Sequence, residues 1–338
     1  MPTLIGGRGP FGPPTALTAL NVAGVPTMGM AGLPLTTGRV IFCDAVNGND
    51  GNQGGGDDPV QTLTQAYSLA TDGANDVIVI VGDGSTAATQ RLSAQLVWAK
   101  DATHLVGMTA PAVGAKRARI STASGATTNI ANLVSVTAQG CIFANFSLFQ
   151  GVGQASTDEK LWQEAGQRNY YSAVDFGGMG SVNGAARAGS YTLQLYGAAE
   201  CTFDGCFFGV DTRDRSAANA NIQIRKNATP TGSTRNLFRG CFFAMRATAT
   251  TPVFIDANES GSMDRYCWFQ GCMFNNFGTS SLAAVVTPHV SQGGYIVMDN
   301  CTVVGATDWT AADSAVVYIA GPVPNGDTSG MAVTADTT

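Results

Sequence analysis

Acidic and basic side chains are densest in one short stretch, where they could take part in acid–base chemistry. Asp211, Arg213, Asp214 and Arg215 lie within residues 211–215, directly after an apolar segment. Hydrolysis of a glycosidic bond needs two carboxylates about 5–9.5 Å apart. Elimination from an acidic polysaccharide would use acids around Ca²⁺ together with a base. Other carboxylates that could join this stretch are Asp175, Asp204, Asp256, Glu259 and Asp264.

The surroundings of these acids favour surface ion pairs over a catalytic pair. The residues that correspond to Asp204 in the repeats described below are Arg239, Gln270 and Asp299, so acids do not recur at adjacent positions. His104 and His289 stand alone, without a Ser or Cys partner motif. We therefore assign no catalytic residue.

A loop rich in Asp, Asn and Gly covers residues 44–58 and could supply the oxygen ligands that Ca²⁺ prefers. Its spacing does not match the EF-hand loop, and a connector with many turns uses the same residue types. The candidate ligands are Asp44, Asn47, Asn49, Asp50, Asp57 and Asp58. We assign no metal ligand and no cofactor, and calcium binding by this loop stays open.

The eight cysteines mostly lie within apolar strands, where a free cysteine behaves as a small hydrophobic side chain. Cys201 and Cys206, like Cys267 and Cys272, are five apart, which does not fit the shorter gaps of zinc sites. We predict a stack of buried, reduced thiols, which suits synthesis in a cytoplasm.

The elements that carry these residues repeat along the chain. An apolar residue stands three before a cysteine and another two after it in residues 203–208, 238–243, 269–274 and 298–303, with a weaker copy at 138–143. A second series, Ile224, Ile255, Val286 and Val317, has a spacing of 31. Such a period indicates a solenoid, and the short alternating apolar runs indicate strands.

Stacked coils would align equivalent side chains in ladders. We expect Phe203, Phe238 and Phe269 to form an inward aromatic stack. Cys206, Cys241, Cys272 and Cys301 would form an inward thiol stack, and the Gly or Asn before each cysteine would occupy a tight corner.

The recurring apolar-x-Gly/Asn-Cys-x-Phe corner resembles that of pectate-lyase-like β-helix proteins. Residues 42–50, 58–66 and 76–84 are similar to the opening of such proteins, with a polar loop, a capping helix and a first buried strand. The resemblance covers about residues 40–320. It implies an all-β, right-handed, single-stranded parallel β-helix, a fold that hosts lyases, hydrolases, adhesins and structural proteins.

Around this trunk we predict four further segments. Residues 1–39 would form an extended Gly/Pro-rich arm, and residues 321–338 an extended tail. Within the trunk, residues 58–72 would form the capping helix, with Asp58 as N-cap and Pro59 in the first turn. Residues 151–190 would form a lateral loop insertion.

Two groups of residues are candidates for contacts with other molecules. Trp162, Tyr170 and Tyr171, in the expected lateral loop, could contact a glycan or a protein partner. The arm is apolar enough to lie along another surface, through Leu4, Ile5, Phe11, Leu17, Leu20, Met28, Met30 and Leu33.

Composition excludes some partners. The net charge is −6, which argues against a nucleic-acid surface. The sequence contains no run of about 18 apolar residues, so we predict no membrane span. The N-terminus lacks the pattern of a secretory signal. Charged residues make up 12% of the chain, about half of what is usual, as corner-rich coils with 42 glycines allow.

These observations and the resemblance lead to two functional expectations. The first is a structural protein of a bacteriophage virion, a capsid decoration or cement protein made in the host cytoplasm, whose arm anchors it to the major capsid protein or another virion protein. The alternative is a tailspike-like protein that binds or degrades a glycan. The resemblance to virion β-helices implies a homotrimer.

Overall fold

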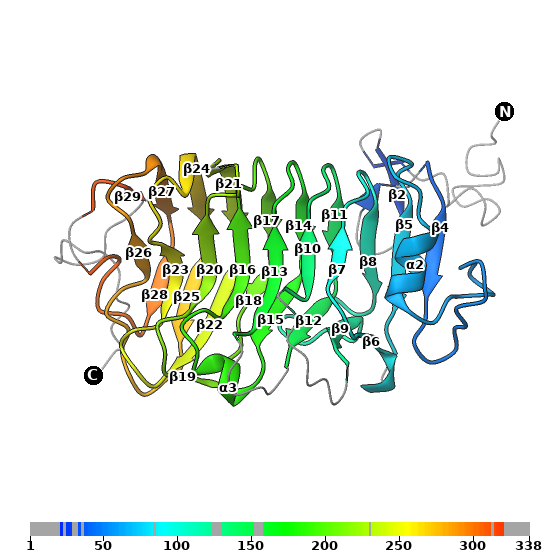
Figure 1. The fold of residues 1–338 in the computed structure, drawn as a ribbon, viewed down its shortest axis with the longest axis horizontal. Helices are drawn as coiled ribbons and strands as arrows, with labels where there is room; N and C mark the ends of the chain where they lie inside the picture. Colours follow the sequence, from blue (N-terminus) through cyan, green and yellow to red (C-terminus); the bar gives the residue numbers. More distant parts are fainter. Residues whose placement is uncertain are drawn as a thin grey trace.

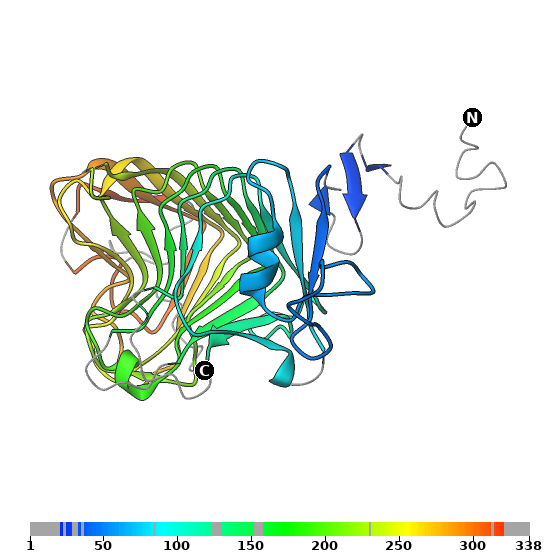
Figure 2. The ribbon, with the colours of Figure 1, turned by 45° about the vertical axis from the view of Figure 1, so that its right-hand side comes forward.

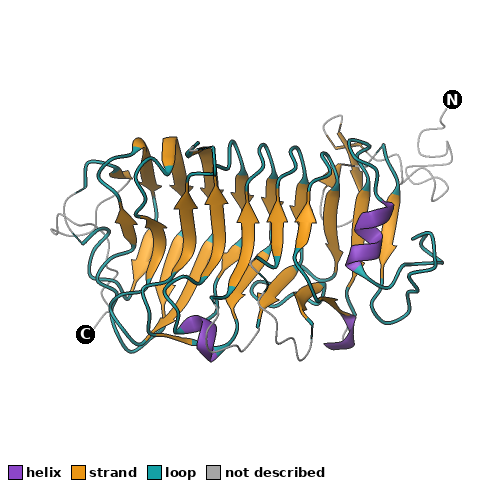
Figure 3. Cartoon of the chain, viewed as in Figure 1, coloured by secondary structure: helices purple, strands orange, loops and turns teal. Residues whose placement is uncertain are grey.

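The protein is described by a computed structural model that covers residues 37–83, 86–123, 130, 132–151, 158–229, 231–311 and 314–320. Before residue 37 it describes only the backbone of three short strands, β1 (Asn21–Val22), β2 (Val25–Met28) and β3 (Leu33–Pro34). From residue 37 onward the chain winds into a long trunk of parallel strands (Figure 1; Figure 3). Turned towards one end, the backbone of the trunk winds as a coil (Figure 2), and buried hydrophobic side chains fill its interior.

Three sheets form the sides of the trunk. The ten-stranded sheet contains β4 (Val40–Cys43), β5 (Val77–Val81), β8 (His104–Met108), β11 (Ile142–Ala144), β14 (Tyr170–Ser172), β17 (Thr202–Asp204), β21 (Ser233–Arg239), β24 (Met263–Gln270), β27 (Gly293–Asp299) and β29 (Val317–Ala320).

The nine-stranded sheet contains β6 (Thr89–Leu92), β9 (Arg119–Thr122), β12 (Ser147–Gln150), β15 (Asp175–Met179), β18 (Phe207–Phe208), β22 (Phe242–Ala247), β25 (Met273–Asn276) and β28 (Thr302–Val304), with β19 (Asp214–Arg215) paired to β22. The seven-stranded sheet contains β7 (Leu96–Trp98), β10 (Val134–Val136), β13 (Lys160–Glu164), β16 (Tyr191–Tyr196), β20 (Ala220–Arg225), β23 (Val253–Ala257) and β26 (Val286–Pro288).

Each coil contributes one strand to each of the three sheets. Seven complete coils run from β5–β6–β7 to β24–β25–β26. Neighbouring coils pair in parallel, as β17 does with β21 and β21 with β24. This is the parallel β-helix that the repeats predict.

The core consists of the ladders expected from the sequence. Phe203, Phe238 and Phe269 stack nearly parallel, with ring centroids 4.5 and 4.6 Å apart. Tyr171 and Phe143 extend the stack toward the N-terminus, at 4.5 and 4.8 Å. A second stack on the nine-stranded sheet contains Phe176, Phe208, Phe243 and Phe274.

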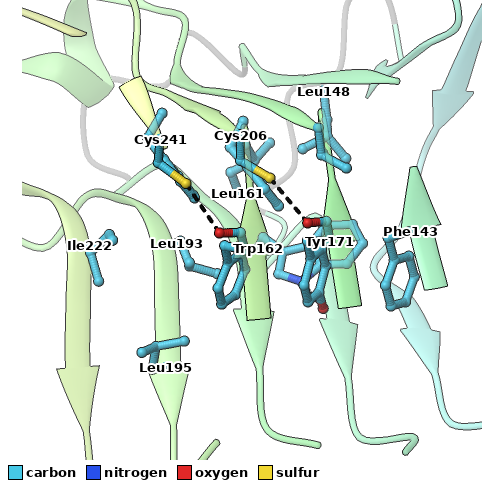
Figure 4. Packing of buried hydrophobic residues seen from close by; sticks show 14 of the residues in the cluster. Phe143, Leu148, Leu161, Trp162, Tyr171, Leu193, Leu195, Cys206, Ile222 and Cys241 are labelled. Atoms are coloured by element: carbon cyan, nitrogen blue, oxygen red, sulfur yellow. Dashed lines mark hydrogen bonds between the residues drawn. The ribbon is translucent and has the colours of Figure 1, made fainter. Parts of the chain in front are cut away.

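The predicted thiol stack is present beside these rings. Cys206, Cys241, Cys272 and Cys301 are buried, and all eight cysteines are free. The Cys206 Sγ lies 3.6 Å from the Tyr171 carbonyl oxygen of the preceding coil, and the Cys241 Sγ lies 3.4 Å from that of Phe203 (Figure 4). The preceding residues turn the corner with positive φ, from Gly205 at 58° to Asn300 at 49°.

The structure corrects two registers. Cys141 does not belong to the thiol stack, because it lies at the corner before β11 of the ten-stranded sheet, as Cys201 does before β17. The stacked cysteines lie at the corner before the nine-stranded sheet. The amide N–H of Cys141 donates to Asn169 and that of Cys201 to Asn236. In the second series, Ile255 pairs with Ile222, not Ile224. Val317 lies in the ten-stranded sheet, paired with Ile296.

The predicted capping helix is shorter and begins later. Helix α2 spans Leu63–Leu69, not 58–72, and its N-cap is Thr62, whose Oγ1 accepts a hydrogen bond from the Gln65 amide. Asp58 is therefore not the N-cap. Leu63 and Ala66 are buried against the trunk, where α2 packs on β4, β5 and β6. In the described part of the chain the other helical turns are η3 (Thr86–Ala88) and α3 (Val182–Ala185).

The predicted lateral loop at 151–190 is wrong. Its described residues form β13, β14, β15 and α3, so this segment continues the coils without leaving the trunk. The prediction took the polar residues of this segment as exposed loop residues. Glu159 and Glu164 are instead buried within the trunk.

In the arm, β1, β2 and β3 pair antiparallel in a small sheet of their own. The side chains of the predicted arm contacts and the whole predicted tail lie outside the described residues. Among the helices that are described, none has the length and apolar character to cross a membrane.

Candidate binding surfaces

The acidic stretch at 211–215 is divided between the surface and the interior. Asp214 forms an exposed ion pair with Arg246, at 3.0 Å. Arg215, expected at the surface, is instead buried on β19 and donates hydrogen bonds to Asn219 and Asn221. Burial lowers the pKa of Arg215 to about 9. The stretch therefore presents two exposed carboxylates, Asp211 and Asp214, and Asp214 is held by an ion pair.

The other carboxylates mostly form the ion pairs that the sequence indicates. Asp204 pairs with Arg239 at 2.5 Å, and this partner holds the pKa of Asp204 below its usual value. Similar pairs join Asp256 to Arg225, Glu259 to Lys226 and Asp264 to Arg265. Each of these four carboxylates therefore has a basic side chain as its ion-pair partner.

Asp175 differs because it is buried. Its Oδ1 lies 2.6 Å from the Lys116 Nζ, and its Oδ2 accepts a hydrogen bond from Ser147. It is buried on the nine-stranded sheet, whereas Asp204 is half-buried on the ten-stranded sheet and paired with Arg239. The ion pair holds residue 116 against the trunk.

Two buried acids were not recognised from the sequence. Burial raises the pKa of Glu164 to about 7 and that of Glu159 to about 7. The Glu164 carboxylate accepts hydrogen bonds from Tyr171 and Asn169 inside the core. It cannot meet a large substrate there, so its role is structural.

Two of the three predicted glycan contacts are wrong. Trp162 and Tyr171 are fully buried, and the Trp162 Nε1–H donates to the Tyr171 Oη. Tyr170 is half-buried, and its hydroxyl donates to Asp204. Inward-facing rings cannot stack on a sugar.

Exposed aromatic rings gather elsewhere, on the outer side of the ten-stranded sheet in the last coils. Tyr266 is 39%, Trp268 37%, Tyr295 52% and Tyr318 51% exposed. Tyr266 is paired in register with Tyr295, and Val297 lies between Trp268 and Tyr318. We call these four rings, with Val297, the aromatic face.

A second exposed apolar group lies on the nine-stranded sheet of the same coils. Met273 and Val304 are exposed on β25 and β28, and Phe277 is exposed directly after β25. Phe242 on β22 is half-buried and is the register partner of Met273. We call these four side chains the apolar face.

A row of polar side chains crosses the outside of the seven-stranded sheet. Gln163 donates to Gln194 at 2.7 Å, and Gln194 donates to Gln223 at 2.6 Å. Gln223 lies 3.4 Å from the Asp256 carboxylate, which also pairs with Arg225 at 2.5 Å. This amide row could hydrogen-bond a polar ligand, and it contains one carboxylate only.

The 44–58 loop uses its acids to fix its own turns. The Asp44 carboxylate accepts from the amides of Val46 and Asn47, and Asp50 accepts from Gln61 and Thr62. Within the described part of the chain, no cluster of three or more His, Cys, Asp or Glu residues could hold a metal ion.

The aromatic face had a sequence signal that was overlooked. In the run Tyr266-Cys267-Trp268-Phe269, Cys267 and Phe269 point inward, so strand alternation places Tyr266 and Trp268 outward. Combining the inward ladders with strand parity would have found these residues.

Comparison with known proteins shows the fold alone. No family model matches the sequence, and no curated protein matches it. The pectate lyase Pel9A matches with a TM-score of 0.54 at 12% identity, over 88% of this chain and 74% of its own. A pectin methylesterase from Aspergillus niger has a TM-score of 0.50 at 14% identity, over 91% of each chain.

A protein of Geobacillus virus E2, ORF18, has a TM-score of 0.46 at 10% identity, over 78% of this chain and 55% of its own, which is too weak a likeness to support an inference. The chain thus has the pectate-lyase-like parallel β-helix fold. That fold supports enzymes as well as inert trunks, so function must be argued from the surfaces.

Proposed function

We propose that this chain is a structural protein of a bacteriophage virion, a decoration or cement protein that anchors through its N-terminal arm. The observation that carries the proposal is the exposure of apolar side chains on two sheets of the last coils. Contiguous exposed apolar surface is unusual on a free monomer and marks an interaction site. A trunk whose end is apolar suits a protein that is built into a larger assembly.

The charged residues support a non-enzymatic role. Asp204, Asp256 and Asp264 each form an ion pair with an arginine, and Asp175 forms a buried ion pair with Lys116. A hydrolase of the two-carboxylate type needs both carboxylates facing one ligand.

The sequence of residues 1–39 supplies the proposed anchor, and we propose a homotrimer as the unit that decorates the particle. Cryo-electron microscopy of particles that contain the protein tests this. We expect symmetric copies, with the arm between neighbouring subunits. Absence of the protein from purified particles, or a trunk attached only at a tail tip, would refute a decoration role.

A second candidate is a tailspike-like protein that binds or degrades a glycan. The amide row favours it, because primary amides at one strand spacing, about 4.8 Å apart, could hydrogen-bond successive units of an extended polysaccharide. The Asp256–Arg225 pair would add one charged group at the end of the row.

The two candidates are separated by a polysaccharide panel, with binding measured by affinity electrophoresis and cleavage by release of reducing ends. The variants are Gln194→Ala and Asp256→Asn, and the matched control is Asp264→Asn, whose carboxylate pairs with Arg265 on another sheet. A decoration protein gives no binding and no cleavage. Binding lost in the first two variants and kept in the control would favour the glycan function.

A further inference from the structure

The connection between β15 and β16 lies over a buried acid. We call its residues 181–190, which include helix α3, the strap. The helix packs on β15 and β19, with Val182 exposed and Gly184 and Ala185 buried (Figure 1). The acid beneath it is Glu159, which is 1% exposed and directly precedes β13.

Two glycines bring the backbone of the strap onto consecutive acids. A Cβ added at Gly184 would lie 2.2 Å from the Cδ of Glu159, and one at Gly189 would lie 2.1 Å from the Oδ2 of Asp158. No side chain fits at such distances, so glycine is needed at both positions. The strap is therefore fitted closely to the carboxyl groups under it.

Hydrogen bonds tie both ends of the strap to Glu159. The Ser181 amide donates to its Oε2, at 3.2 Å, and the Glu159 amide donates to the Ser190 Oγ, at 2.9 Å. The Oε1 atom is buried and has no hydrogen-bond partner among the described residues. Burying a charge without full compensation is costly, so the closed strap favours the protonated acid. Burial accordingly raises the pKa of Glu159 to about 7.

The charged groups around Glu159 are held in other contacts. Asp158 pairs with Arg187 of the strap, at 3.8 Å. Arg213 donates to the backbone just before the strap, and its charge lowers the pKa of Glu159 without offsetting burial. Lys160 lies over an aromatic ring of β16. Ionised Glu159 therefore has no ion-pair partner in the closed arrangement of the described residues.

The strap also covers a buried cation on its other side. The Asn219 amide donates to the carbonyl oxygens of Ala185 and Arg187, at 2.8 and 3.1 Å, and accepts from the Arg215 Nε at 2.7 Å. Arg215 is 2% exposed, and its Nη2 has no hydrogen-bond partner in the described part of the chain. Movement of the strap away from the trunk would therefore let water reach a buried base as well as a buried acid.

We propose that the strap is a pH-sensitive closure, held shut over a neutral Glu159 and released when that carboxyl ionises. In the released state, water solvates the carboxylate and the Arg215 guanidinium, and Asn219 loses its two bonds to the strap. This device belongs to the trunk and does not depend on the proposed virion role.

Proton linkage gives the direction of the response. With the strap open, Glu159 loses its proton near the ordinary pKa of 4.5, whereas with the strap closed it does so at about 7. The ratio of open to closed strap therefore rises with pH between these two values and levels off above about 7.

Hydrogen–deuterium exchange of the full chain, followed by mass spectrometry at pH 5.5 and pH 8, tests the closure. After correction for intrinsic exchange rates, exchange in residues 181–190 should rise about 25-fold, if opening restores the ordinary pKa of Glu159. Glu159→Gln does not ionise, so its strap should stay protected at both pH values. The matched control is Glu164→Gln, at a buried acid whose pKa is also raised and whose hydrogen-bond partners lie outside the strap. It should respond to pH as the wild type does.

A second variant and a second readout separate release of the strap from other effects. Gly184→Ala forces a Cβ into the Glu159 carboxyl and should raise exchange of the strap at both pH values. Trypsin at pH 8 should cut after Arg187 several-fold faster in the wild type than in Glu159→Gln, with circular dichroism verifying that both are folded.

The comparison of the two pH values in the wild type decides the proposal without any variant. Equal protection of the strap at pH 5.5 and pH 8 would overturn it. So would a rise in exchange that is equal throughout the trunk, or a pH response of the strap that persists in folded Glu159→Gln.

Discussion

Glu164 links burial in this core to pH. Its carboxyl is enclosed by Tyr171, Asn169 and the Gly166 amide, and burial raises its pKa from 4.5 to about 7. Below about pH 4.5 it is protonated in both the folded and the unfolded chain, so its full contribution to stability is present. Between these values the unfolded chain releases the proton first, so the free energy of unfolding falls as pH rises through 7.

Glu164→Gln should remove this pH dependence, because glutamine resembles the protonated acid in shape and does not ionise. At 1.36 kcal/mol per pH unit, the difference between 4.5 and about 7 corresponds to about 3 kcal/mol. Melting temperatures at pH 4.5 and pH 8 measure the effect. Glu159 still contributes in the variant, since its pKa is also about 7. Glu200→Gln, at a half-buried carboxylate that pairs with Arg168 and Arg235, is the control. An unchanged pH dependence in Glu164→Gln would contradict the assignment.

Substitutions at two glycines distinguish the cost of a positive φ from the cost of a steric clash at Cβ. Gly271 has a φ of 59° with open space around a Cβ, and Asn300 occupies the corresponding corner of the next coil. We expect Gly271→Asn to cost about 1 kcal/mol or less. At Gly278 a Cβ would lie 1.9 Å from the Ala247 carbonyl oxygen, so Gly278→Ala must displace backbone and cost several-fold more. Urea denaturation of both variants compares the costs, and equal costs would refute this distinction.

At the scale of elements, the sequence predicts which residue types stack but not every register. The Phe and Cys ladders follow from one pattern that recurs in successive coils. Cys141 was misplaced because each coil turns two corners around the ten-stranded sheet, and both favour a positive φ just before a small buried residue, as at Gly140 and Gly205. A local pattern cannot distinguish the two corners.

Trp162 and Tyr171 failed as contact candidates for a related reason. In a strand, a shift of one residue exchanges the inner and outer faces, so an aromatic side chain is placed only when the register is known. The polar residues of that coil made its strands hard to recognise from the sequence. Glu164 and Asn169 are buried there because they hydrogen-bond to each other within the core.

The buried ion pair between Lys116 and Asp175 ties a loop to the nine-stranded sheet. Asp175→Asn leaves the Lys116 ammonium buried without a charged partner, and we expect a loss of about 3–5 kcal/mol in the free energy of unfolding. Asp214→Asn breaks the exposed pair with Arg246 and should cost at most about 1 kcal/mol. Urea denaturation measures both. A loss in Asp175→Asn no larger than in Asp214→Asn would show that the pair is not an anchor.

For the whole molecule, Arg39, the last residue of the predicted arm and one that the deletion of residues 2–38 keeps, already contacts the trunk. The Arg39 amide donates to Asp76, and its guanidinium donates to the carbonyl oxygens of Gln53 and Leu69. Strand β4 pairs with β5, and α2 packs on both. The small sheet of β1, β2 and β3 is separate from the three sheets of the trunk. Deletion of residues 2–38 should therefore leave the trunk folded.

The same deletion should abolish incorporation into the particle if the apolar arm is the anchor. Two measurements are needed on the deleted chain: a thermal melt, expected to match the full chain within a few degrees, and its amount in purified particles relative to the full chain. A second variant replaces Leu4, Ile5 and Phe11 with serine, which removes apolar contacts and keeps the length of the arm. Because burial of apolar surface contributes about 25 cal/mol per Å², this variant should also lose most of its incorporation. Normal incorporation of the deleted chain would refute the arm as anchor and leave the outward faces of the last coils as the remaining means of attachment.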